Sequence, residues 1–83
     1  MKAYERMKMY QWLYDLLVRA GHEGVTREEV NARWMAEHKE WSGGGPMSRA
    51  TFFNYRREVE ALYGVEVRCR RLTTGLVVYW IEI

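Results

Sequence analysis

Residues 48–63 have the sequence SRATFFNYRREVEALY, and Gly64 follows them. Ser48 favours the N-cap of a helix and Gly64 suits the left-handed residue that ends one, so the stretch predicts a helix. At about 100° per residue, one side gathers a predicted core face: Phe52, Tyr55, Val59, Leu62 and Tyr63. The other side carries a set without an acid: Ala50, Phe53, Asn54, Arg57 and Ala61. Because a solvated helix face usually mixes charge signs, this side predicts an anionic partner.

The composition indicates one small globular domain spanning residues 1–83. The hydrophobic fraction is 48%, which is enough for a packed core and argues against disorder. Cys69 is the single cysteine, so the chain can form no internal disulfide, as is typical of a cytoplasmic protein. Residues 1–11 hold scattered charges and no signal-peptide core, and no segment approaches the ~20 apolar residues of a membrane span.

Charge is unevenly distributed along the chain. Residues 1–47 contain seven basic and seven acidic side chains, whereas residues 48–83 contain six arginines and four glutamates. The whole excess of +2 therefore lies in the second part, and its cations are all arginine. Arginine suits bidentate contacts with phosphate and guanine, although a mild basic bias is also common on ordinary soluble surfaces.

Two further helices are predicted before residue 48. Apolar residues at helical spacing predict a helix over residues 4–20, and Val25 predicts a short extended segment after it. Thr26 and Glu29 have the spacing of a capping box, which predicts a second helix from Arg27 to about residue 38, or as far as Trp41. Residues 42–47, SGGGPM, predict a loop, and they lack the lysine of a phosphate-binding loop.

A β-hairpin is predicted after Gly64. Residues 65–71 alternate apolar and polar side chains, residues 72–75 predict a turn, and residues 76–83 predict the return strand. The predicted core-facing residues are Val65, Val67, Cys69, Val77, Tyr79, Ile81 and Ile83. Val78 and Trp80 lie on the opposite face, and a hairpin with two apolar faces needs cover on both. We therefore hypothesise that they pack against a C-terminal region outside this sequence or against a second protomer in a homodimer.

This order of elements is typical of an α+β winged helix-turn-helix, in which three helices precede a two-stranded antiparallel hairpin, the wing. The predicted recognition helix, residues 48–63, would enter the major groove of double-stranded DNA, and the hairpin, residues 65–83, would contact the flanking backbone. Asn54 suits adenine, Arg57 suits guanine or phosphate, and Ala50 and Phe53 suit thymine methyl groups. The complete predicted DNA-binding set is Ser48, Arg49, Thr51, Phe53, Asn54, Arg57, Arg70, Arg71, Thr73 and Thr74.

The chain also resembles the N-terminal domain of bacterial WYL-domain transcriptional regulators. The resemblance spans nearly the whole chain, and its most specific parts are Ser-x-x-Thr-Phe-x-Asn at 48–54, Tyr-Gly-Val-Glu-Val at 63–67 and Cys-x-Arg at 69–71. It implies a DNA-binding domain followed by a ligand-sensing WYL domain, so we expect the sequence to end at that domain boundary. By position it implies a DNA-facing set of Arg49, Thr51, Phe53, Asn54 and Arg57. Ala50 stands where a second polar or basic residue is common in the family.

Two other classes of function remain as alternatives. A winged helix can serve as a protein-interaction or dimerisation module without nucleic-acid binding, because fold does not fix function. That alternative predicts a continuous apolar patch around Phe53 in place of a cationic surface. An enzyme is not expected, because the sequence holds no paired Ser, His and Asp constellation and no cluster of metal ligands, and we expect no cofactor or metal.

Overall fold

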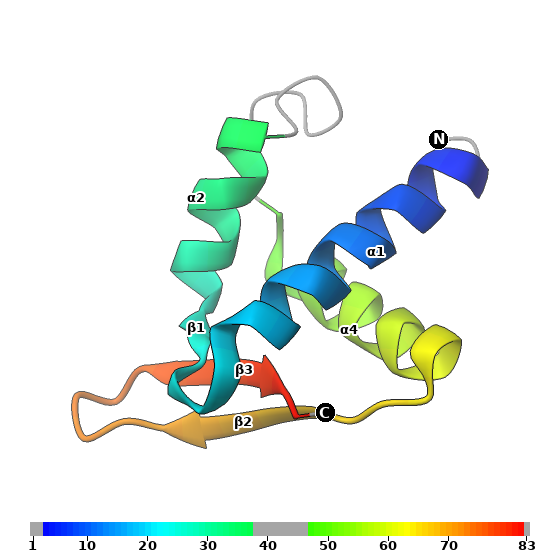
Figure 1. Cartoon of the computed structure of the whole chain (residues 1–83). Helices are drawn as coiled ribbons and strands as arrows, with labels where there is room; N and C mark the ends of the chain where they lie inside the picture. Colours follow the sequence, from blue (N-terminus) through cyan, green and yellow to red (C-terminus); the bar gives the residue numbers. More distant parts are fainter. Residues whose placement is uncertain (1–2, 38–46, 83) are drawn as a thin grey trace.

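The computed structural model describes residues 3–37 and 47–82, which form an α+β domain (Figure 1). Its helices are α1 (Ala3–Ala20), the short 3-10 helix η1 (Gly21–Glu23), α2 (Arg27–Glu37) and α4 (Arg49–Tyr63). Its strands are β1 (Val25–Thr26), β2 (Val67–Arg71) and β3 (Val77–Ile81). Figure 1 shows the three α-helices gathered on one side of the sheet, so the core lies between them and the strands.

The sheet of the described residues is antiparallel and has three strands in the order β1-β3-β2. The predicted two-stranded hairpin is therefore incomplete, because Val25 pairs with Tyr79 and Thr26 pairs with Val78. β2 pairs with the other edge of β3, from Val67 opposite Ile81 to Arg71 opposite Val77. The third strand forms because a hairpin leaves one edge of its return strand with unpaired backbone groups, which the short extended segment satisfies.

The predicted starts of α2 and α4 are confirmed by their N-caps. The Ser48 hydroxyl accepts a hydrogen bond from the Thr51 backbone N–H at 3.1 Å, and Thr26 accepts one from the Glu29 N–H at 3.1 Å. At the other end of α4, Gly64 adopts φ 64° and ψ 35°, the left-handed conformation that its sequence position predicts. The predicted extension of α2 to residue 38 or 41 and the loop at 42–46 lie outside the described residues.

Met47 links α2 to the beginning of α4. Its side chain is buried, and its backbone N–H donates a hydrogen bond to the Asn31 side-chain oxygen at 2.9 Å. A side chain of α2 thereby satisfies a backbone donor just before the N-cap of α4. This contact fixes the place at which α4 begins relative to α2.

The core joins α1, α2, α4 and the sheet. Its buried residues are Met9, Leu13, Leu17, Val30, Trp34, Met47, Phe52, Val59, Val67, Tyr79 and Ile81. On α4, the predicted core face is correct at Phe52 and Val59 but wrong at Leu62 and Tyr63, which are 46% and 38% exposed. The last turn of α4 is therefore only partly covered, and Tyr63 stacks on Tyr14 of α1 with ring centroids 4.0 Å apart.

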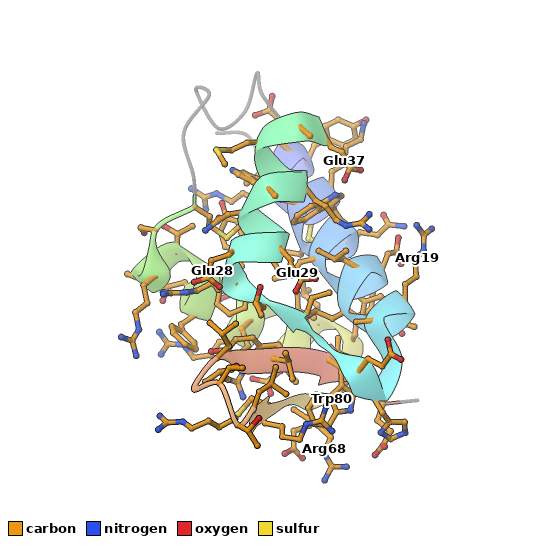
Figure 2. The ribbon with its side chains drawn as sticks, turned by 90° about the vertical axis from the view of Figure 1, so that its left-hand side faces the viewer. Arg19, Glu28, Glu29, Glu37, Arg68 and Trp80 are labelled. Atoms are coloured by element: carbon orange, nitrogen blue, oxygen red, sulfur yellow. The ribbon has the colours of Figure 1, made fainter. Side chains whose placement is uncertain are left out.

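The second face of β3 is covered within this chain. Val78 and Trp80 are only 4% and 9% exposed, so the prediction that they need a second protomer or a further domain as cover is wrong. η1 and Gly24 contribute to this cover: the His22 ring lies 6.2 Å from the Trp80 ring, and Gly24 approaches Val78. Figure 2 shows Trp80 and Arg68 on the side of the sheet away from the helices.

Cys69 is exposed, so the prediction that it is a buried core residue is wrong. Its cross-strand partner Tyr79 contacts Phe52 of α4, with ring centroids 5.0 Å apart, so Cys69 does lie on the helix-facing side of the sheet. β2, however, is an edge strand, and of its residues only Val67 is buried. An alternating pattern predicts which face a residue occupies, but it does not predict how far the helices extend over the edge of that face.

Within residues 3–37 and 47–82, no helix combines the length and apolar character needed to cross a bilayer.

Candidate nucleic-acid interface

The exposed side of α4 presents Asn54 and Arg57 together. Both side chains are exposed, and Arg57 Nη2 donates a hydrogen bond to Asn54 Oδ1 at 2.7 Å. We call these two residues the Asn–Arg pair. The contact holds the guanidinium along the helix and leaves the Asn54 amide N–H groups free to donate. Because a carbonyl oxygen has two lone pairs, Asn54 can accept a second hydrogen bond from a ligand while it holds Arg57.

The N-terminus of α4 carries three of the predicted residues. Ser48 donates its hydroxyl hydrogen to Thr51 Oγ1 at 2.9 Å, so the two hydroxyl groups face each other across the first turn. Thr51 therefore retains its own hydroxyl hydrogen for an external acceptor. Arg49 is exposed at the first helical position, where the helix dipole favours negatively charged ligands.

Phe53 is half-buried, as is Thr51, whereas the other predicted residues of α4 are exposed. Its ring makes edge-to-face contacts with Phe52 and Tyr79, at centroid distances of 5.4 and 6.2 Å. The guanidinium carbons of Arg49 and Arg56 lie 5.6 and 6.0 Å from the same ring. Phe53 thus contributes to packing and also supports two cations at the surface, since guanidinium groups are attracted to aromatic faces.

A groove of about 240 Å³ brings α2, α4 and the hairpin turn together. Its lining residues, which define the hairpin groove, are Arg27, Glu28, Arg49, Phe53, Gly75, Leu76, Val77 and Tyr79. Arg27 and Arg49 each occupy the first position of a helix, so two cations and two positive helix ends meet here. Arg27 was not among the predicted DNA-binding residues, although the capping box already indicated a helix N-terminus there. Figure 2 shows Glu28 at the start of α2.

A second opening of about 580 Å³ lies between α1 and α4. Its lining residues, which define the α1 cleft, are Arg6, Tyr10, Thr51, Asn54, Tyr55, Arg57 and Glu58. Tyr10 and Tyr55 meet edge to face at 5.3 Å, and burial, followed by the neighbouring Tyr10, raises the Tyr55 pKa above its usual value while Arg6 opposes the shift. Arg6 and Tyr10 were not predicted to take part, because nothing local in the sequence connects them with α4.

The structure separates the predicted residues of the hairpin. Arg70, Arg71, Thr73 and Thr74 are all exposed. Arg70 lies opposite Val78 on the sheet face away from the helices, with its guanidinium carbon 5.6 Å from the centre of the Trp80 ring. Arg71 lies opposite Val77, on the face that also carries Tyr79 and the hairpin groove. Only Arg71 therefore shares a sheet face with α4, because successive strand residues point to opposite faces.

Two other arginines of the second part stabilise the fold. Arg56 is half-buried, and its Nη2 donates a hydrogen bond to the Val67 carbonyl oxygen at 2.8 Å. Arg68 pairs with Glu82 at 2.7 Å, and His22 contacts the other oxygen of that carboxylate at 3.0 Å. Among the described arginines of the second part, Arg49, Arg57 and Arg71 remain available on the helix-facing side.

No protein-family model, curated protein or solved structure matches this chain. The resemblance to WYL-domain regulators therefore stays a prediction from the sequence.

Proposed function

We propose that this chain is a DNA-binding domain of a bacterial transcriptional regulator, with α4 in the major groove and the β2–β3 turn along the flanking backbone. The observation that carries the proposal is the hairpin groove, where Arg27, Arg49 and the hairpin turn converge beside the Asn–Arg pair of α4. Cations and helix N-termini bind phosphates, whereas exposed amide and guanidinium groups read bases. One surface therefore carries both kinds of group that sequence-specific DNA recognition needs.

The arrangement of elements supports a winged helix-turn-helix. α2 and α4 are joined through the Met47 contact, and the sheet follows with the hairpin turn adjacent to α4. In such domains the second helix of the motif lies in the major groove. The resemblance to WYL-domain regulators supports the same assignment, and it implies a cytoplasmic regulator with a ligand-sensing domain after the hairpin.

The dimensions of α4 suit this role. Its 15 residues span about 22 Å at 1.5 Å per residue, and a helix with side chains is about 10–12 Å across, close to the ~12 Å width of the major groove. The small side chains Ala50 and Ala61 are exposed on the same side as the Asn–Arg pair. They allow the helix to approach the base edges closely, so that the longer side chains of the pair can reach them.

The experiment begins with duplexes selected from random DNA by the purified chain. The wild type should retard a selected duplex in a gel, with a steep loss of affinity as salt rises, since each neutralised phosphate contributes about 0.9 to the log–log slope. Asn54→Ala and Arg57→Ala should each lower affinity for the selected duplex more than for a scrambled one. Arg19→Ala, which removes an exposed arginine from the far end of α1, is the matched control and should change neither affinity.

Two outcomes would contradict the proposal. The first is the absence of retardation by the folded wild type at low salt. The second is an equal loss of affinity for selected and scrambled DNA in both variants. That result would mean that the two side chains attract phosphates but do not recognise bases.

A protein-interaction module is the second candidate, and the exposure of Leu62 and Tyr63 at the end of α4 favours it. Apolar side chains gathered on one helix turn suit a protein partner better than DNA. If the chain failed to retard DNA but bound a partner, and Leu62→Asp abolished that binding, this candidate would replace the first.

A further inference from the structure

The exposed stripe of α4 lines one opening and adjoins another, because Asn54 and Arg57 themselves line the α1 cleft. At about 100° per residue, Thr51 and Glu58 fall on one side of the Asn–Arg pair, and both line the α1 cleft. Arg49 and Phe53 fall on the other side, and both line the hairpin groove. The helix that carries the candidate base contacts is therefore bordered along both flanks by openings that contain arginine.

The geometry of DNA predicts what each flank of α4 would contact in the major groove. A helix with its side chains nearly fills the ~12 Å width of the major groove, so the phosphates of one strand lie along one flank and those of the other strand along the opposite flank. A recognition helix seated in this way needs cationic partners on both sides. On the hairpin side Arg27 and Arg49 supply them, whereas on the α1 side Arg6 is the cation that comes from outside α4.

The α1 cleft has the chemistry of a phosphate contact. Arg6 is exposed, and within residues 3–37 and 47–82 it forms no ion pair. Thr51 adds a hydroxyl group to the same cleft, and hydroxyls are common partners of backbone phosphates. Glu58 lines the same cleft, and its negative charge repels an anion. Removing the charge of Glu58 should therefore strengthen phosphate binding, whereas removing the charge of Arg6 should weaken it.

We propose that α1 takes part in DNA binding, with Arg6 contacting a phosphate of one strand while Arg27 and Arg49 contact the opposite strand. This inference rests on the proposed function, because it concerns the same surface. It assigns to the first helix a role that neither the sequence pattern nor the resemblance assigned to it. The ligand group is the phosphodiester of duplex DNA, and the contact adds affinity without reading bases.

The first test measures the salt dependence of binding to a selected duplex. Arg6→Gln should reduce the log–log salt slope by about 0.9, the contribution of one phosphate, and Arg6→Lys should retain the wild-type slope. Arg19→Gln is the matched control, because Arg19 is an exposed arginine of the same helix that lines a different cleft with Arg33 and Glu37 (Figure 2). Its slope should equal that of the wild type. Glu58→Gln should tighten binding at every salt concentration.

The second test assigns the strands by phosphate ethylation interference. For the wild type, ethylation of phosphates on both strands beside the same groove should interfere with binding. Arg6→Gln should lose interference on one strand only, and Arg27→Gln should lose it on the other strand only.

The possible failures are distinguishable. If the folded wild type does not bind DNA, the proposed function fails, and the role of α1 fails with it. If the wild type binds but Arg6→Gln behaves like Arg19→Gln, or Glu58→Gln does not tighten binding, the role of α1 alone is wrong. Loss of interference on the same strand in the Arg6 and Arg27 variants would refute the assignment of strands. Circular dichroism of each variant confirms that the comparison is between folded proteins.

Discussion

Gly24→Ala should destabilise the fold strongly. Gly24 has φ 72° and ψ 174°, a region that essentially only glycine occupies and that costs about 1–3 kcal/mol for other residues. A Cβ at this position would also lie 2.8 Å from Val78 Cβ and 3.2 Å from the Tyr79 carbonyl oxygen. Neither atom can rotate away, so overpacking should add about 1–3 kcal/mol. We expect a total loss of about 2–6 kcal/mol, against a total stability of about 4–12 kcal/mol for a chain of this length.

Gly21→Ala is the control for this prediction. Gly21 also has a positive φ, 59°, but an added Cβ would meet no atom within 4 Å. It should therefore lose only the cost of a left-handed residue, about 1–2 kcal/mol. Urea unfolding followed by circular dichroism measures both variants. If the two variants differ by less than about 0.5 kcal/mol, the close packing of Gly24 on β3 contributes nothing to stability and the reasoning is refuted.

Two further predictions concern α4. Arg56→Met should cost about 1.5–3 kcal/mol in urea unfolding, because it removes a hydrogen bond from a charged donor to the Val67 carbonyl, whereas Arg57→Met should change stability by less than about 0.5 kcal/mol. Equal losses would mean that the bond from Arg56 to β2 is not a stabilising one. The pKa of Tyr55 is raised mainly by burial, so the folded state binds the phenolic proton of Tyr55 more tightly than the unfolded state does. The stability that this tighter binding contributes is complete below pH 10 and is lost as pH rises through the folded pKa. Tyr55→Phe should therefore flatten the decline of the unfolding free energy above pH 10, and an unchanged decline would contradict the burial effect.

Local signals in the sequence predict the helices well. The Ser48 hydroxyl and Gly64 mark the two ends of α4, and Thr26 with Glu29 marks the start of α2, because caps depend on a few adjacent residues. The third strand is harder to foresee. Val25 and Thr26 are too few to show alternation, and they become a strand only because the distant β3 offers them an edge.

Burial was harder to predict than secondary structure. Trp80 and Val78 lie on a face that the hairpin alone would expose, and their cover comes from η1 and Gly24, segments more than fifty residues earlier. Cys69 shows the reverse error, since alternation places it inward but no helix extends over that part of β2. Both errors arise because periodicity describes one element, whereas burial depends on which other elements reach it.

The residues of the candidate site also differ in how far the sequence predicts them. Asn54 and Arg57 could be predicted from the helical pattern, since they lie one turn apart on a single helix. Arg6 could not be predicted, because it comes close to them only through the packing of α1 on α4. For Arg27, the position at a helix start was predictable, but its proximity to Arg49 was not.

The hydrogen bond between Arg57 and Asn54 has a consequence for how this surface can change over evolution. The amide restricts the arginine before any ligand arrives, so a substitution at position 54 also releases the side chain at position 57. The effects of changes at the two positions should then be non-additive, as is usual for residues in direct contact. A descendant of this chain that acquires a new target should therefore exchange positions 54 and 57 as a couple, while Ala50 and Ala61 on the same side vary independently.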